Sequence, residues 1–336
     1  MAVEQRLPTE SGEDRLIARY FAPLARHPGA FGLSDDAAIL TPPEGHDVVL
    51  KADAIIGGVH FFPDDPAHAI GRKALRVNLS DLAAKGADPA GFLMSLALPE
   101  GVTDEWLDGF ARGLEADIEH YRCPLMGGDT DRTPGPTMVA IAAFGLLPRG
   151  KMVRRTGAQP GDAILVTGTI GDATLGLRLR HDPGAANRWH LGDAFRDHLL
   201  RRYLLPSPRV AVAPAMRTHA AAAMDVSDGL VGDLAKLCQA SLLSADIELV
   251  RVPLSEAARR ALAAEPALLD EMLTGGDDYE ILCAMPPDHV TAFRSAAGAL
   301  GVAVTEIGRF AGGEGTRFID EDGKEKTFAR VSYSHF

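Results

Sequence analysis

The chain contains only three cysteines, Cys123, Cys238 and Cys283, in 336 residues. They are far apart and form no Cys-x-x-Cys or Cys/His spacing, so neither a disulfide framework nor a zinc site is expected. We expect them to be core thiols of a protein from a reducing compartment. Basic residues (34 Lys and Arg) are outnumbered by acidic ones (46 Asp and Glu), giving a net charge of −12. With no local basic cluster to offset this excess, a nucleic-acid partner is not expected.

The chain also lacks a long hydrophobic run. Its longest apolar stretch, Met138 to Leu147, is too short to cross a bilayer, and the first fifteen residues have no apolar core of a signal peptide. These absences predict a cytoplasmic protein without a membrane partner.

Several common catalytic motifs are missing as well. The sequence has no GxxxxGK[ST] phosphate loop, no GxGxxG fingerprint, no HRD or DFG pair and no GxSxG elbow. A phosphate-handling enzyme with this sequence would therefore depend on metal ions held by carboxylates and on a few cationic or backbone donors.

Strand-like and helix-like segments alternate along most of the chain, which predicts an α/β (α+β) fold. Strands are expected near 48–56, 92–98, 137–146, 163–167, 222–226, 246–250, 279–285 and 302–308, with helices between them, including 67–85, 104–120 and 230–238. The polar, glycine- and proline-bearing stretch after Gly150 marks a domain boundary, giving domains 1–149 and 150–336. The segment GGEGTRFIDEDGKEK near the end is expected to be a solvated, turn-rich region.

What the chain does have is a set of aspartates in apolar or glycine-rich surroundings. They are Asp53, Asp81, Asp129, Asp225, Asp228, Asp277 and Asp278. A buried carboxylate is costly unless it is paired or bound to metal, and few cations lie near these positions in sequence. A set of oxygen ligands without cysteine suits Mg²⁺ rather than zinc or copper.

Ordinary structural roles compete with this interpretation at each position. Asp81 lies on the apolar face of the helix 67–85 but could form a surface pair with Lys85. Ser227 or Asp228 could cap the following helix. The two Gly-Gly-Asp segments, at 127–129 and 275–277, use the residue types of simple turns. Taken alone, His60 could be a core histidine and Arg155 a surface charge rather than a phosphate clamp.

The joint pattern resembles a known family. The blocks SDDAAIL, KADAIIGGVHFF, KALRVNLSDLAAKGADP, GGDTDR, RTGAQPGDAILVTGTIGDATLGL, SPR, MDVSDGL, GGDDYEIL and YSHF follow the order and spacing of thiamine-monophosphate kinases, in the superfamily of aminoimidazole ribonucleotide synthetase. The resemblance covers nearly the whole chain. It implies ATP-dependent phosphorylation of thiamine phosphate to thiamine diphosphate, and a homodimer whose N-terminal sheets join into a barrel with the active site near the interface.

The resemblance also implies roles for individual residues. Magnesium ligands are expected at Asp36, Asp53, Asp81, Asp129, Asp225 and Asp228. Nucleotide contacts are expected from Gly128, Asp129, Arg155 and Ser227, and substrate contacts from His60, Asp277 and Tyr333. No catalytic residue distinct from the metal ligands is expected, because the acceptor phosphate is already anionic and direct in-line transfer needs no strong general base.

Some positions depart from the family pattern. Lys51 and Ala52 stand where many members have hydroxyl residues, one of which helps to bind magnesium, so a carbonyl or water would replace it, or Lys51 would reach a phosphate. Asp277 is one methylene shorter than the usual glutamate, and Ser34 and Ser332 replace glycines. Two alternatives therefore stay open: another ATP-using member of the superfamily, or a non-catalytic metal- or nucleotide-binding regulator on the same fold.

Overall fold

The structure is a computed structural model that describes residues 12–333. The chain divides into two compact units. The first consists of Met1–Thr41, Ala52–Leu75 and Ala90–Ala143, and the second of Pro42–Lys51, Arg76–Pro89 and Phe144–Phe336. Long elements pass from one unit into the other, so the boundary predicted near Gly150 stays a prediction.

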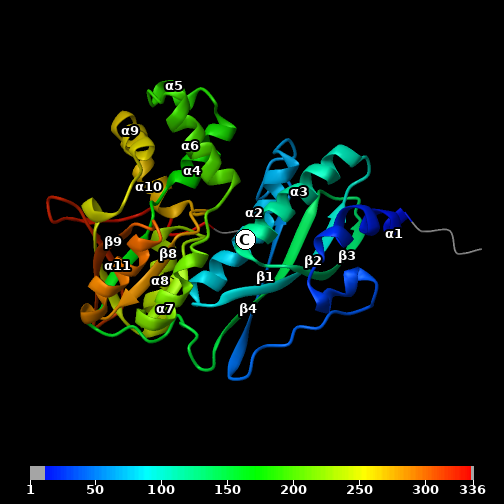
Figure 1. The fold of residues 1–336 in the computed structure, drawn as a ribbon. Helices are drawn as coiled ribbons and strands as arrows, with labels where there is room; N and C mark the ends of the chain where they lie inside the picture. Colours follow the sequence, from blue (N-terminus) through cyan, green and yellow to red (C-terminus); the bar gives the residue numbers. More distant parts are fainter. Residues whose placement is uncertain (1–11, 334–336) are drawn as a thin grey trace, which may run out of the picture. The chain divides into compact units, whose positions relative to one another are not determined.

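One sheet has four strands in the order β1-β4-β2-β3 (Figure 1). The strands are β1 (His46–Ile56), β2 (Asp88–Leu98), β3 (Leu125–Arg132) and β4 (Met138–Pro148). Strands β2 and β3 run parallel, with Met94 opposite Gly128 and Ser95 opposite Asp129. A Cβ at Gly128 would lie 1.9 Å from the carbonyl oxygen of Met94, so only glycine fits at this point of the pairing.

Two long helices, α2 (Ala67–Ala84) and α3 (Asp104–Tyr121), follow β1 and β2. Thr103 caps α3 by accepting a hydrogen bond from the Trp106 amide, as its position before an acidic first turn favours. Where the first half of α2 meets α3, Gly113 allows close approach, because a Cβ there would lie 2.1 Å from the His68 carbonyl oxygen. The short N-terminal elements are α1 (Gly12–Leu16), a π-helix (Ile17–Phe21) and two 3₁₀ helices (Ala22–Leu24 and Pro28–Leu33).

The second sheet has seven strands in the order β11-β10-β7-β9-β5-β8-β6. They are β5 (Ala163–Thr167), β6 (Ala222–Asp225), β7 (Ser244–Glu248), β8 (Ile281–Met285), β9 (Val304–Ala311), β10 (Gly315–Ile319) and β11 (Glu325–Lys326). Neighbouring strands are antiparallel except for β7 and β10, which are parallel.

Helices cover both faces of this sheet. Ile164 and Val166 of β5 belong to a core with α8 (Leu230–Ser241), while the alternate side chain Leu165 belongs to a second core. This second core includes α7 (Ala213–His219) and α11 (Val290–Ala299). Side chains alternate across a strand, so one continuous apolar run builds both cores.

A third core lies among helices alone (Figure 1). It contains α4 (Asp172–His181), α5 (Ala185–Arg188), α6 (Asp193–Leu204), α9 (Glu256–Ala264) and α10 (Leu268–Thr274). Trp189 is almost fully buried there and donates its indole N–H to Glu265 at 2.8 Å. Three 3₁₀ turns complete the described chain: Val210–Val212, Leu249–Arg251 and Pro287–His289.

This mixed α/β arrangement with two sheets confirms the predicted fold class, and the three cysteines are buried free thiols as expected. Two expectations were wrong. Gly127–Asp129 is not a turn but part of β3, and the segment expected to be turn-rich near the end contains β10 and β11. Among residues 12–333, no helix is both long and apolar enough to cross a membrane.

Asp172, the first residue of α4, provides a test of the helical core. It is buried and accepts hydrogen bonds from His198 (3.0 Å), Ser255 (2.5 Å) and Thr169 (2.6 Å). Burial alone would raise the pKa of Asp172, but these hydrogen bonds outweigh it and hold the pKa below its usual value. The ionised form is therefore favoured in the folded protein.

We predict that Asp172→Asn lowers the free energy of unfolding at pH 7 by about 1–3 kcal/mol. A lowered folded-state pKa contributes stability above the unfolded-state pKa, and this contribution disappears as pH falls through the folded-state pKa. The difference between wild type and variant should therefore shrink below about pH 4. Urea unfolding at several pH values measures it, with Asp193→Asn as an exposed control. A difference independent of pH would contradict this assignment.

Candidate active site

Two loops that carry predicted site residues are joined backbone to backbone in the second unit. The amide of Asp277 donates to the carbonyl oxygen of Ser227, and that of Tyr279 donates to Val226, both at 2.8 Å. Gly276 makes this contact possible: its φ is +81° and a Cβ there would lie 2.1 Å from the Ser227 carbonyl oxygen. The fold thus places Ser227, predicted to contact nucleotide, beside Asp277, predicted to contact substrate.

Tyr333 joins the same group of residues. Its amide donates to the carbonyl oxygen of Asp228 at 3.0 Å, which fixes the end of the described chain against the 226–229 loop. Tyr333 is 39% exposed, and the guanidinium of Arg330 lies over its ring, 5.2 Å from the centroid. The predicted stacking of Tyr333 on a thiamine ring stays a prediction.

The acid of Asp228 does not cap α8. The N-cap is Gly229, and no side chain caps the helix there. Instead, the Asp228 carboxylate accepts from Lys236 at 2.5 Å, and Lys236 also contacts Asp233 at 2.8 Å. Asp233 accepts hydrogen bonds from the amides of Ser227 (3.0 Å) and Asp228 (2.9 Å), so the capping interpretation was wrong and an acid inside the helix holds the loop.

The second unit also brings Asp81 and Asp225 together. Asp225 is the last residue of β6, and its Oδ2 is buried without a hydrogen-bond partner among the described residues. Burial, and after it the neighbouring charge of Asp81, raise the pKa of Asp225 to about 8. Asp81 forms an ion pair with Lys51, 2.7 Å between Nζ and Oδ2. The local pair with Lys85 considered above is therefore wrong, because Lys85 donates to the Ala223 carbonyl oxygen instead.

A buried ion cluster around Glu280 stabilises the 275–279 loop. Glu280 is fully buried and accepts hydrogen bonds from Arg209 (Nε at 2.6 Å), Arg202 (2.9 Å) and Thr167 (2.7 Å). The same Arg202 nitrogen donates to the carbonyl oxygen of Asp278 at 2.9 Å. One carboxylate is thus neutralised by two arginines, one of which also fixes the loop backbone.

The fully buried side chain of Asp278 stabilises the same loop. It accepts from the amide of Gly171 at 2.9 and 3.0 Å, just before α4 begins. Burial raises the pKa of Asp278 well above its usual value. Of the two adjacent acids, Asp278 therefore points into the protein, and Asp277 remains the candidate for substrate contact.

The remaining predicted residues belong to the first unit, except Arg155. His60 closes the turn after β1: its Nδ1 accepts from the Ile56 amide at 3.1 Å, and its carbonyl oxygen accepts from Lys73 at 2.9 Å. Because Nδ1 accepts the hydrogen bond from the Ile56 amide, the proton of the neutral His60 ring is on Nε2. Asp36, Asp53 and Asp129 are exposed, as is Gly128, so their polar groups can reach a ligand.

Within residues 12–333, no three side chains of His, Cys, Asp or Glu are grouped closely enough to hold a metal ion alone. The pair Asp81 and Asp225 nevertheless fits a magnesium site, because one buried oxygen of Asp225 has no partner. Mg²⁺ is commonly bound through one or two carboxylates, completed by substrate phosphates and water. The donor set thus suits an ion that binds together with a phosphate-bearing substrate.

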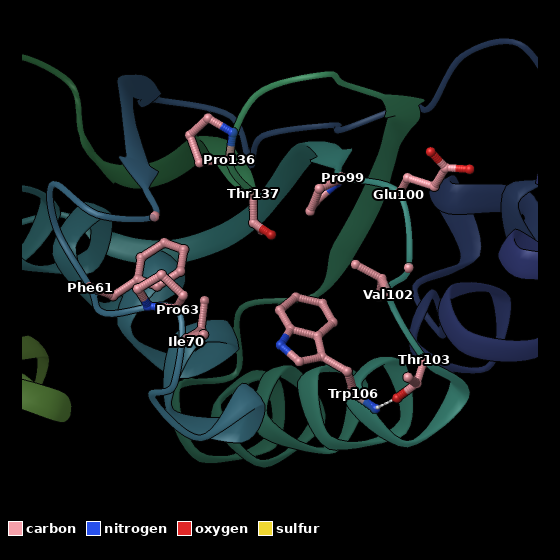
Figure 2. Close-up of a pocket in the computed structure, with 12 residues that line it drawn as sticks. Phe61, Pro63, Ile70, Pro99, Glu100, Val102, Thr103, Trp106, Pro136 and Thr137 are labelled. Atoms are coloured by element: carbon pink, nitrogen blue, oxygen red, sulfur yellow. Dashed lines mark hydrogen bonds between the residues drawn. The ribbon is translucent and has the colours of Figure 1, made fainter.

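The first unit contains an apolar pocket of about 330 Å³ (Figure 2). Phe61, Ile70 and Trp106 point into it from the turn after β1, from α2 and from α3. The size and lining suit a planar ring. Among the described residues, none of the predicted site residues lines this pocket. Apart from scattered aromatic residues, nothing in the sequence indicates a pocket here.

Sequence reasoning missed Glu280 and Lys236. Both carried a detectable signal: Glu280 is a glutamate directly before an apolar strand, and Lys236 lies three residues after Asp233 on an apolar helix. Their partners, Arg202, Arg209 and Asp228, could not be inferred, because they are placed by tertiary packing.

Comparison with known protein families identifies the class to which this chain belongs. Residues 34–147 match the N-terminal domain and residues 159–321 the C-terminal domain of AIR synthase related proteins. This defines the class of protein.

The specific family follows from closer relatives. A thiamine-monophosphate kinase from Caulobacter vibrioides is 43% identical over 323 residues, covering 95% of this chain and 89% of the relative. The crystal structure of the enzyme from Stenotrophomonas maltophilia K279a has a TM-score of 0.81 at 38% identity, covering 93% and 96% of the two chains. The structure of AaThiL complexed with AMPPCP and TMP has a TM-score of 0.77 at 30% identity, covering 92% and 97%. The chain therefore belongs to the thiamine-monophosphate kinase family, which confirms the resemblance seen in the sequence.

The ion cluster behind the 275–279 loop leads to a prediction about local stability. Arg202→Met removes one of the two cations on Glu280 and the donor to Asp278. A hydrogen bond to a charged group contributes about 1.5–3 kcal/mol, so amide exchange in 275–280 should accelerate at least about tenfold through easier local opening. Hydrogen–deuterium exchange mass spectrometry measures this, with the exposed neighbour Arg201→Met as control. Equal exchange in both variants would show that Arg202 does not hold the loop.

Proposed function

We propose that the chain transfers the terminal phosphoryl group of ATP to thiamine phosphate, producing thiamine diphosphate and ADP. The observation that carries this proposal is the backbone junction of Ser227, which we propose contacts the nucleotide, with Asp277, which we propose contacts thiamine phosphate. Family membership supports it. So does the AaThiL complex, whose two ligands correspond to an ATP analogue and the acceptor.

The proposed metal ligands are the aspartates expected from the sequence. They are Asp36, Asp53, Asp81, Asp129, Asp225 and Asp228. When bound, magnesium would neutralise charge on the transferred phosphoryl group and reduce the repulsion between the two polyanionic substrates. The unpartnered buried oxygen of Asp225 supports this role for that residue.

Contacts to the two substrates are assigned on the same basis. We assign the nucleotide phosphates to Gly128, Asp129, Arg155 and Ser227, and thiamine phosphate to His60, Asp277 and Tyr333. Asp277 has a φ of +62° and its carboxylate accepts from the Tyr279 hydroxyl at 3.2 Å. A side chain fixed in this way can orient a ligand despite being one methylene shorter than glutamate.

The proposed chemistry is direct in-line transfer. The acceptor oxygen belongs to a phosphate that is already anionic at neutral pH, so no general base is required and no phosphoenzyme forms. The task of the protein residues is to align the two phosphates and to exclude water as a competing acceptor.

We further propose a homodimer in which the four-stranded sheets of two copies join into a barrel, with domains at 1–149 and 150–336. Strand β1 supports this assembly, because Val48 and Leu50, two residues apart and so on the same face, are 40% and 71% exposed. Closing a sheet into a barrel also covers its edge strands.

The proposal predicts a specific product. Purified protein with Mg²⁺ and ATP should convert thiamine phosphate to thiamine diphosphate, and should use free thiamine poorly because it lacks the acceptor phosphate. Chromatographic analysis of both reactions measures this. A folded preparation that binds ATP but forms no thiamine diphosphate would instead favour a regulatory protein.

The metal assignment predicts the effect of Asp225→Asn. This change keeps the shape of the side chain but removes a charged oxygen ligand, so turnover should fall at least about 100-fold, as for other lost transition-state charge stabilisers. Mn²⁺ binding measured by electron paramagnetic resonance should weaken in parallel. Asp288→Asn, on an exposed turn, is the control. Turnover within a few-fold of wild type would make Asp225 a structural residue.

A further inference from the structure

Three backbone segments meet at the end of α2 in the second unit. The amide of Val153 donates to the carbonyl oxygen of Lys85 at 3.1 Å, and the amide of Ala223 in β6 donates to that of Arg154 at 2.9 Å. The Lys85 ammonium links the first and third of these segments by donating to the Ala223 carbonyl oxygen at 2.6 Å. The Lys85 side chain is therefore held at the carboxyl end of α2, against the segment that carries Arg155.

This junction gathers positive charge. Burial, and after it the charge of Arg155, lower the pKa of Lys85 to about 8, and these effects outweigh the opposite influence of Asp81 and Asp225. Arg155 is exposed, and its carbonyl oxygen accepts from Ser241 at 2.9 Å. The backbone segments that carry these two cations are thus fixed near each other, and an anion bound between the cations would stabilise this arrangement.

The neighbouring acids do not serve as that anion. Asp81 is engaged by Lys51 at 2.7 Å, and Asp225 leaves its Oδ2 without a partner rather than accepting from Lys85. An ammonium group has three donors, and among the described residues Lys85 has one acceptor, Ala223. Donors on Lys85 therefore remain for a ligand.

We propose that Lys85 is a phosphate-binding residue that acts with Arg155 on the polyphosphate of the nucleotide. This inference rests on the proposed function and adds a contact to its nucleotide site. A lysine and an arginine together complement a phosphate well, because the guanidinium supplies a directional fork and the ammonium a compact point charge.

The test compares ligands that differ only in phosphate. Isothermal titration calorimetry with Mg²⁺ present measures the binding of ADP and of adenosine to wild type, Lys85→Met and Lys85→Arg. A charge-assisted hydrogen bond of about 1.5–3 kcal/mol corresponds to at least about a tenfold change in Kd. Lys85→Met should raise the Kd of ADP by that factor and leave adenosine unchanged, and Lys85→Arg should largely restore ADP binding. Lys324→Met, an exposed lysine, controls for the loss of one charge.

The possible outcomes are distinct. Unchanged ADP binding in a folded Lys85→Met protein would overturn the inference. An equal loss of affinity for ADP and adenosine would also overturn it, because Lys85 would then only stabilise the position of β6. Tripolyphosphate serves as a second probe if wild type binds no ADP. Its binding to wild type but not to Lys85→Met would support the anion site while the proposed function fails, and its failure to bind wild type would overturn both.

Discussion

The candidate site depends on one contact, the backbone junction between the 226–229 and 275–279 loops. Two amide hydrogen bonds and one glycine bring the loops together, and neither loop has regular secondary structure. The junction is stable because buried charge supports it: Glu280 begins the segment into β8 and is neutralised by Arg202 and Arg209. Breaking a buried ion pair costs several kcal/mol, so the loops are fixed more firmly than their own hydrogen bonds would allow.

Much of the fold could be predicted from sequence periodicity, for reasons that the structure makes clear. The bounds of β5 are predictable because all five of its residues are buried and the first four, 163–166, are apolar. β3 was missed because LMGGDTDR has the composition of a turn, yet its glycine pair is required by the close pairing of Gly128 with Met94 in β2. β10 was missed for a related reason, since only Phe318 of its residues is buried.

The acids of the site can be predicted from the sequence, because a carboxylate in apolar surroundings needs a partner. The identity of that partner cannot be predicted from the surrounding sequence. Lys51 pairs with Asp81, which is distant in the sequence, and Lys236, on the second turn of α8, reaches back to Asp228. Sequence spacing allows two local alternatives, an ion pair of Asp81 with Lys85 and a helix cap by Asp228. In the structure, tertiary contacts replace both of them. Short-range spacing therefore identifies which charges need compensation, while the fold decides what compensates them.

The state of each acid also explains why metal and phosphate would bind together. Asp81 and Asp228 are each neutralised by a lysine, and Asp225 by its raised pKa, so the protein without ligands carries no dense uncompensated negative charge here. A divalent ion bound at Asp225, as proposed, would add positive charge near Lys51, Lys85 and Arg155. This would be unfavourable until a polyanion bound as well. A polyphosphate would supply that negative charge, and by linkage the bound ion would favour the polyphosphate by the same factor. Reciprocal coupling of this kind would favour binding of the metal–nucleotide complex over either component alone.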